Sequence, residues 1–113
     1  MIIFEVKSIT GKTIRLTAIQ WVHIRKRHPE MDNQLSKLTI TIQQPDLIYY
    51  CPEEDNVHYY KHFKETPVSE KYLLLIAQHT NGDGFVITAF FVKKIRKEKK
   101  EVVYGEKNLN KLR

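Results

Sequence analysis

Short apolar runs at the start of the chain alternate with polar residues and predict β-strands. Residues 2–7 are rich in β-branched and aromatic side chains, and within residues 12–16 the apolar Ile14 and Leu16 fall on one face. Gly11 lies between the two runs, where it favours a turn. The pattern therefore predicts a β-hairpin.

The apolar spacing then changes to a helical one. Thr17 followed by Gln20 matches a capping box, which predicts that a helix begins there. Pro29 limits this helix, because the residue before a proline avoids the helical backbone. A second helix is predicted from Asp32 to the region of Pro45, with apolar residues at helical spacing. Those apolar residues are Leu35, Leu38 and Ile42.

After Pro45 the pattern predicts strands again. The continuous apolar run 72–77 is typical of a central strand that is buried on both faces. Residues 81–84, Asn-Gly-Asp-Gly, predict a turn that makes the strands on either side antiparallel. Residues 93–100 fit a helical turn or a loop, and residues 102–104 fit a short edge strand. The other candidate strands are residues 47–51, 57–63, 71–78 and 85–92.

Because the helices are grouped and the strands are grouped, the chain is expected to adopt an α+β fold. The grouping predicts an antiparallel sheet packed on two helices. A length of 113 residues suits one core. Residues 1–113 are therefore expected to form a single domain with a basic C-terminal segment, 93–113.

Positive charge is concentrated in that segment. Residues 93–113 hold nine Lys or Arg and three Glu, which accounts for the whole formal net charge of +6. A neutral body with a basic end favours a polyanion such as nucleic acid as a partner; the alternative is a solvated tail that aids solubility. The residues predicted to bind nucleic acid are Lys93, Lys94, Arg96, Lys97, Lys99 and Lys100.

Several classes of protein are excluded by what the sequence lacks. It has no run of 18 apolar residues, and its single Cys51 cannot form an internal disulfide. It has no His and Cys at zinc-site spacing, no glycine-rich phosphate loop and no serine-hydrolase elbow. We therefore expect a cytoplasmic domain without a membrane span, a metal or another cofactor.

The first predicted helix carries the most suggestive polar residues. On a helical wheel, Gln20, His23 and Arg27 fall on one side, away from the core side that carries Trp21. A histidine and an arginine one turn apart can move a proton and hold a phosphate. His28 falls beside Trp21 and is assigned a structural role. The alternative for His23 is an ordinary surface histidine.

A second polar group lies on the predicted strand 57–63. Strand alternation places His58, Tyr60 and His62 on one face and Lys61 on the other. His58 and His62 are roughly 13 Å apart, too far to share a metal ion. An aromatic and cationic surface for RNA is the preferred interpretation.

Thr88 is the third candidate, because its hydroxyl interrupts the apolar strand 85–92. Alternation places it on the face of Val86 and Phe90. Its hydroxyl either bonds to a neighbouring group of the sheet or faces a ligand.

Taken together, these segments resemble the phage-type barnase/EndoU/colicin/RelE-like (BECR) nuclease domains. The sharpest part is the block His-x-x-x-Arg-His-Pro-Glu within residues 21–31, and the similarity extends from about Thr17 to Tyr104. The other supporting segments are residues 42–48, 72–78 and 86–90. The resemblance implies a RelE/barnase-like layout, with two N-terminal helices packed on a curved antiparallel sheet of about four to six strands. The concave face of that sheet would hold the active site.

The resemblance also implies a function, that of a metal-independent endoribonuclease, toxin-like or phage-borne, which attacks the phosphate with the RNA 2′-hydroxyl. RNA, such as tRNA or mRNA, would be the substrate, and an antitoxin or immunity protein is an expected partner. The alternative is a non-catalytic module on the same fold that binds RNA or another partner.

Cleavage of this kind needs a base, an acid and a cation at the phosphate. Neither Glu5 nor Glu30 is well placed as the base, so a histidine has to serve. The expected roles are His23 as base or acid, Arg27 and Lys61 as phosphate clamps, Tyr60 or His58 as the second proton-transfer group, and Thr88 as a hydrogen-bonding partner of the phosphate or of His23.

Overall fold

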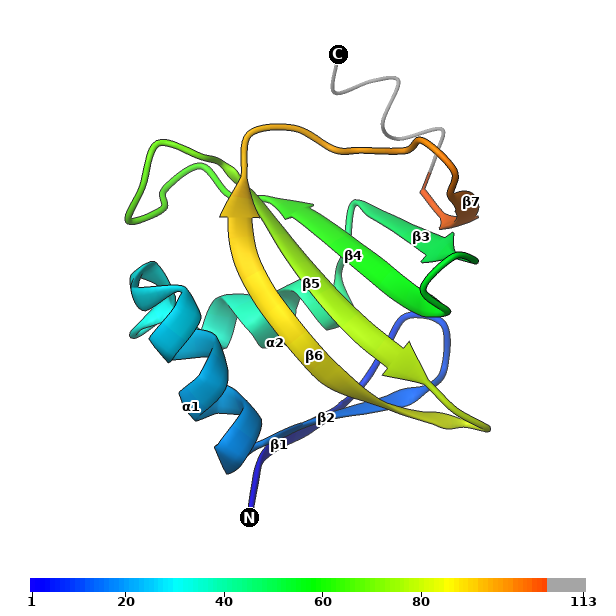
Figure 1. The fold of residues 1–113 in the computed structure, drawn as a ribbon, viewed down its shortest axis with the longest axis horizontal. Helices are drawn as coiled ribbons and strands as arrows, with labels where there is room; N and C mark the ends of the chain where they lie inside the picture. Colours follow the sequence, from blue (N-terminus) through cyan, green and yellow to red (C-terminus); the bar gives the residue numbers. More distant parts are fainter. Residues whose placement is uncertain (106–113) are drawn as a thin grey trace.

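The computed structural model describes residues 1–105, which form seven strands, two α-helices and one short 3₁₀ helix (Figure 1). In chain order these elements are β1 (Ile2–Lys7), β2 (Thr13–Thr17), α1 (Ala18–Arg27), η1 (Pro29–Met31), α2 (Leu35–Gln43), β3 (Leu47–Cys51), β4 (Asn56–His62), β5 (Tyr72–His79), β6 (Asp83–Val92) and β7 (Glu101–Tyr104). Residues 106–113, the end of the predicted basic segment, lie outside the described residues. The strands predicted from the sequence are confirmed to within a few residues, including the short edge strand β7.

The seven strands form one mixed sheet in the order β1-β2-β6-β5-β4-β3-β7. Neighbouring strands are antiparallel except β2 and β6, which run parallel and pair Thr13–Arg15 with residues 83–85. The α+β class is confirmed. The expected RelE/barnase-like layout, with N-terminal helices on an antiparallel sheet of four to six strands, is wrong.

Long-range pairing explains this difference. The β1–β2 hairpin precedes the helices and joins the sheet through β2 and β6, while β7 pairs with β3 at the other edge. Both contacts join segments that are far apart along the chain, so local patterning does not reveal them. Beyond its three paired residues, β6 has no described strand on its outer side, and α1 lies along that edge (Figure 1).

Local chemistry sets the helix ends. The Thr17 hydroxyl accepts a hydrogen bond of 3.2 Å from the backbone N–H of Gln20, as the capping pattern predicts. α1 ends before His28, which precedes Pro29 and leaves the helical region with φ −132° and ψ 78°. α2 begins at Leu35 rather than Asp32, because Asp32 ends η1 with extended backbone and Asn33 adopts a left-handed conformation with φ 64°.

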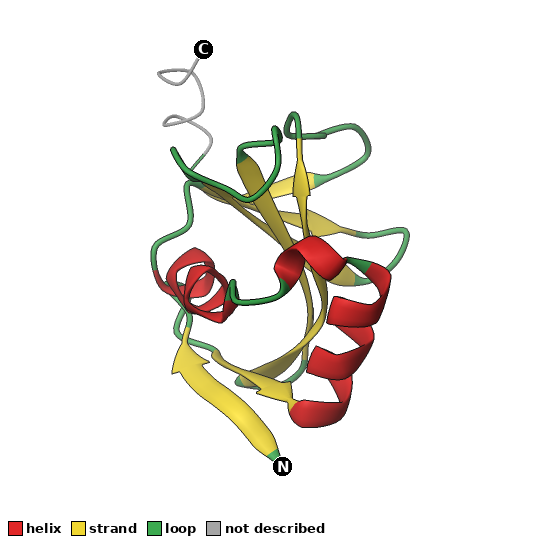
Figure 2. Cartoon of the chain, turned by 90° about the vertical axis from the view of Figure 1, so that its left-hand side faces the viewer, coloured by secondary structure: helices red, strands yellow, loops and turns green. Residues whose placement is uncertain are grey.

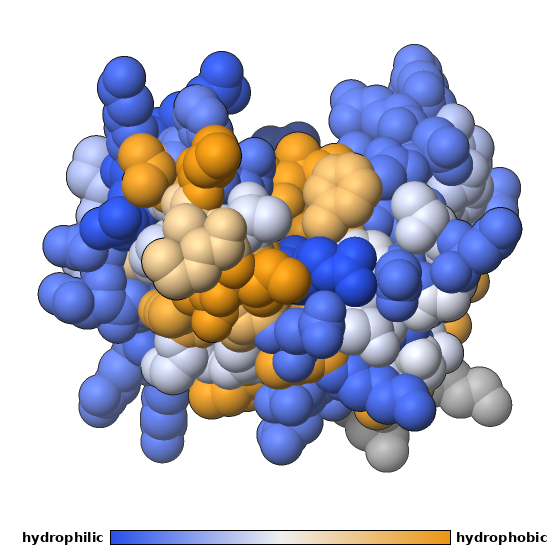
Figure 3. Space-filling view, turned by 90° about the horizontal axis from the view of Figure 1, so that it is seen from below, coloured by the Kyte–Doolittle hydropathy of each residue, from blue (hydrophilic) through white to orange (hydrophobic). Residues whose placement is uncertain are grey.

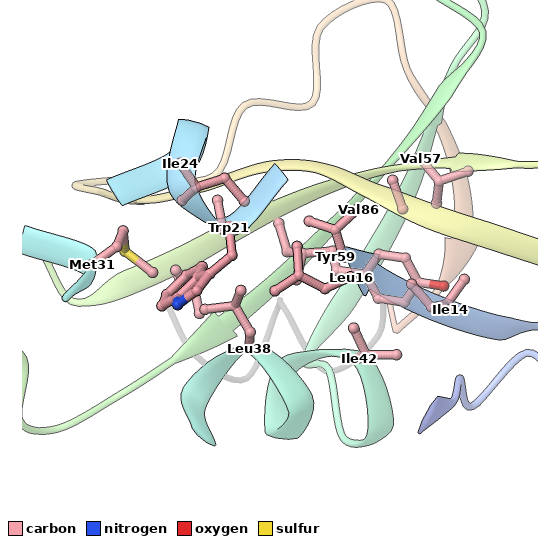
Figure 4. Close-up of a cluster of buried hydrophobic side chains, with 14 of the residues drawn as sticks. Ile14, Leu16, Trp21, Ile24, Met31, Leu38, Ile42, Val57, Tyr59 and Val86 are labelled. Atoms are coloured by element: carbon pink, nitrogen blue, oxygen red, sulfur yellow. The ribbon is translucent and has the colours of Figure 1, made fainter. Parts of the chain in front are cut away.

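Apolar side chains fill both faces of the sheet. One face packs against the helices, and Figure 4 shows the core there, where Trp21 and Leu38 lie close to Leu16. The opposite face, hereafter the second face, carries a smaller cluster, and the segment 93–100 packs on it through Ile95. That segment is a loop rather than a helical turn. Members of the second cluster are Leu47, Tyr49, Tyr60 and Leu74. Figure 2, seen from the α1 edge, shows the helices against the curved strands.

Apolar side chains are also exposed at the end of the molecule that carries the N-terminus. Figure 3 shows this end, where apolar atoms gather among hydrophilic ones. Its exposed residues include Met1, Ile2 and Ile19, and the Met1 carbonyl accepts a hydrogen bond from the start of α1. The segment 93–100 lies at the opposite end (Figure 1). None of the described helices is both long and apolar enough to span a membrane.

Candidate functional site

A cavity of about 500 Å³ lies between α1 and the outer part of β6. We call it the α1–β6 cavity. It brings together three residues that were predicted to act in catalysis, His23, Arg27 and Thr88. His23 and Arg27 are exposed to solvent, whereas Thr88 is half-buried on the strand. The full lining consists of Gln20, His23, Ile24, Arg27, His28, Ile87, Thr88 and Phe90.

Gln20 fixes α1 against the strand. Its side-chain amide donates a hydrogen bond to the backbone carbonyl of Ile87. That carbonyl lies beyond the stretch of β6 that pairs with β2, so the glutamine takes the place of a neighbouring strand. Only half of the predicted capping box forms as a result, because the Gln20 side chain bonds to β6. His23 and Arg27, one turn apart on the same helix, are thereby held over the edge of β6.

His28 also lines the cavity, although the helical wheel assigned it a structural place beside Trp21. Its ring stacks on Phe90 with ring centres 4.7 Å apart and planes inclined by 20°. Its Nδ1 lies 3.9 Å from an Oε2 of Glu30. The helical wheel does not apply to His28, because this residue lies outside the helix, in the extended backbone that precedes Pro29. The His-Pro pair was the sequence signal for this change of direction.

Two neighbouring arginines of α1 differ in their contacts. The Arg25 guanidinium lies 5.4 Å from the centre of the Trp21 ring and 3.7 Å from an Asp32 carboxylate oxygen. Within residues 1–105, the Arg27 side chain forms neither a hydrogen bond nor an ion pair. The Arg27 guanidinium therefore remains available to an anion in the cavity.

His58 lies on the same face of the sheet as Thr88 but does not reach the cavity. The strand register places Ile76 between them, so two strand spacings, roughly 10 Å, separate the two backbones. His58 is 7 % exposed, and its Nε2 lies 2.9 Å from the side-chain oxygen of Asn56. Burial and the nearby Lys100 ammonium lower the pKa of His58 to about 4, so the ring is neutral at neutral pH.

Tyr60 and Lys61 are also directed elsewhere. Tyr60 is 1 % exposed beneath the 93–100 loop, its hydroxyl accepts a 3.4 Å hydrogen bond from the backbone N–H of Arg96, and burial raises its pKa. Lys61 lies on the opposite face, where its Nζ is 3.6 Å from a carboxylate oxygen of Asp46. The structure therefore does not bring His58, Tyr60 and Lys61 to the α1–β6 cavity.

The basic segment divides into three parts. Lys93, Lys94 and Arg96 line a second cavity, of about 520 Å³, at the end of β6. Lys97 and Lys99 are exposed and line neither cavity. Lys100 faces its own chain: its Nζ donates a 2.6 Å hydrogen bond to the Arg96 carbonyl and lies 6.0 Å from the Tyr60 ring centre.

The α1–β6 cavity thus combines two imidazoles, a guanidinium and a hydroxyl. Such a set can exchange protons and bind a phosphate oxygen. Among the residues that the structure describes, no three His, Cys, Asp or Glu side chains are close enough together to hold a metal ion.

No protein-family model, no curated protein and no solved structure matches this chain. The resemblance of residues 21–31 to the BECR nucleases therefore stays a prediction, and arguments about function depend on the site itself.

Proposed function

We propose that the protein is a ribonuclease that cleaves RNA in the α1–β6 cavity, by attack of a 2′-hydroxyl on the adjacent phosphate and without a metal ion. One observation carries the proposal: His23, Arg27, His28 and Thr88 line the same cavity. Histidine is the side chain that gains and loses protons near neutral pH, and two of them can act as a base and an acid.

In the proposed reaction, one histidine removes the proton from the 2′-hydroxyl. The 2′-oxygen then forms a bond to phosphorus, and the bond between phosphorus and the 5′-oxygen breaks. The second histidine donates its proton to the leaving 5′-oxygen. The products are a 2′,3′-cyclic phosphate and a 5′-hydroxyl. His28 thereby takes the role that the sequence assigned to Tyr60 or His58.

Arg27 and Thr88 bind the phosphate in this scheme. A guanidinium can donate two parallel hydrogen bonds to phosphate oxygens, which suits the charge that develops during the attack. Thr88 approaches from β6, on the other side of the cavity, with a hydroxyl that can donate one more hydrogen bond. In the cytoplasm such an enzyme needs control, so an antitoxin or immunity protein that covers the cavity is part of the proposal.

The test is incubation of the purified protein with labelled RNA in EDTA, followed by analysis of the new ends. We expect cyclic phosphate ends, and His23→Ala should lower the single-turnover rate by about 10²–10⁴-fold. His28→Ala should lower it in the same range. His62→Ala is the matched control, because His62 is an exposed histidine on β4 that lies outside the cavity.

Rates must be compared at equal folded fraction, measured by circular dichroism, because both changes lie at α1. Cleavage that EDTA abolishes and magnesium restores would contradict the metal-free mechanism. Full activity of folded His23→Ala and His28→Ala would remove the cavity from the reaction. Tight binding of RNA that stays intact would support the alternative, a non-catalytic RNA-binding module.

A further inference from the structure

The cavity at the end of β6 has features that the proposed cleavage reaction does not use. Lys93, Lys94 and Arg96 surround it, and Phe91 and Val92 contribute apolar surface. The three cationic side chains form no hydrogen bond or ion pair within the described part of the chain. Glu70 is the acidic residue in its lining. The Glu98 carboxylate, outside this lining, interacts electrostatically with Lys94 and Arg96. The cavity therefore presents three cations against Glu70, with Glu98 nearby.

The loop that carries these cations is held in place. Ile95 packs into the apolar cluster on the second face, and the Arg96 backbone N–H is bonded to the Tyr60 hydroxyl. Tyr60 is itself fully packed in the sheet. Lys93 to Arg96 thus extend from a fixed stretch of backbone, which lowers the entropy lost when they bind an anion.

The two cavities follow one another along a single strand. Phe90 lines the α1–β6 cavity, and Phe91, whose side chain points to the other face of the strand, lines the second cavity at the end of β6. The distance along β6 from Thr88 to Val92 is roughly 13 Å, at about 3.3 Å per residue. A strand of RNA whose scissile phosphate lies at Thr88 can therefore place a phosphate about two nucleotides away among the cations.

We propose that the second cavity is a phosphate-binding subsite for a nucleotide about two positions from the cleaved bond, and that the substrate is single-stranded RNA. This inference rests on the proposed function. Single strands bind to proteins through a basic groove that follows the backbone, with apolar surface for the bases, and the Lys93–Arg96 region combines both. The subsite makes cleavage depend on the length of the RNA.

The experiment compares kcat/KM for a five-nucleotide RNA, cleavable only at the bond after its third nucleotide, with kcat/KM for the corresponding dinucleotide. The ratio of the two values measures what the flanking phosphates contribute. We expect the double variant Lys93→Gln/Arg96→Gln to lower this ratio roughly ten- to a hundredfold, the usual effect of losing charge-assisted hydrogen bonds. Glu70→Gln should raise it.

The matched control is Lys97→Gln/Lys99→Gln, which removes the same charge from the same loop outside the cavity. This control should keep most of the wild-type ratio. An unchanged ratio in Lys93→Gln/Arg96→Gln, or an equal loss in the control, would overturn the subsite.

A second readout separates this inference from the proposed function. If the wild-type protein cuts neither RNA, the proposed function fails. The subsite is then decided by fluorescence anisotropy with a labelled five-nucleotide RNA whose central 2′-hydroxyl is absent. If Lys93→Gln/Arg96→Gln binds this RNA at least tenfold more weakly than the wild-type protein does, and the control does not, the result supports the subsite. Equal binding by all three proteins would overturn it.

Discussion

Acidification from about pH 7.5 to about pH 4.5 is expected to destabilise the fold through two histidines, His58 and His79. His58 is buried on the second face, and the Lys100 ammonium is near enough to act on its charge. His79 is half-buried, and its Nε2 lies 3.1 Å from the hydroxyl of Tyr59. Burial, with Lys100 near His58 and Lys12 near His79, lowers the pKa of each ring from 6.5 to about 4.

The sign follows from proton binding. Between pH 6.5 and about 4, the unfolded chain binds a proton on each of these histidines and the folded chain does not. The stabilisation is thus complete above pH 6.5 and is lost as the pH falls through about 4. The pKa difference corresponds to roughly 3 kcal/mol at about 1.4 kcal/mol per pKa unit. Water reaches part of each ring, so we expect a loss of about 2 kcal/mol per histidine.

The assay is urea denaturation at several pH values, followed by the fluorescence of Trp21, the only tryptophan, which is 9 % exposed. His58→Gln and His79→Gln should each flatten the decline of the unfolding free energy with falling pH by about 2 kcal/mol. His62→Gln, at an exposed histidine on β4, is the control for the substitution itself. If plots of the unfolding free energy against pH run parallel for wild type, His58→Gln and His79→Gln, the reasoning is refuted.

Two further predictions concern Arg27 and Gly84. Arg27→Lys should lower the rate of RNA cleavage roughly tenfold or more, because lysine keeps the charge but loses the two-pronged donor geometry. Its effect on unfolding by urea should be small. A cleavage rate equal to that of the wild type would assign Arg27 a general electrostatic role. Gly84→Ala should destabilise the fold by about 1–3 kcal/mol in the same denaturation assay, because a Cβ there would lie 2.7 Å from Cδ1 of Ile14 and 2.9 Å from the backbone oxygen of Gln78. Ile14→Val in the same chain should recover part of that loss, and an unchanged midpoint for Gly84→Ala alone would contradict the packing argument.

Local signals in the sequence predicted most elements of this fold. The Thr17 cap, Pro29 and the turn at 81–84 each act within a few residues, so they could be read without tertiary information. The parallel pairing of β2 with β6 could not, because it joins residues about seventy positions apart through only three pairs. That one contact changed the sheet from antiparallel to mixed.

The candidate site shows the same division. The helical period placed His23 and Arg27 together, and both line the cavity. His28 was misplaced because the wheel was continued into a residue that precedes proline. His58 and Tyr60 were taken for an open polar face, but the 93–100 loop packs over that face, a tertiary contact that strand alternation does not report.

The central claim is that RNA is cut in the α1–β6 cavity by its own 2′-hydroxyl. It is tested most directly with a five-nucleotide RNA that is cut at one bond in EDTA, compared with the same molecule lacking only the 2′-hydroxyl at that bond. We expect the first to yield a 2′,3′-cyclic phosphate and the second to stay intact while binding with similar affinity. Cleavage of the 2′-deoxy molecule at a comparable rate would contradict the account.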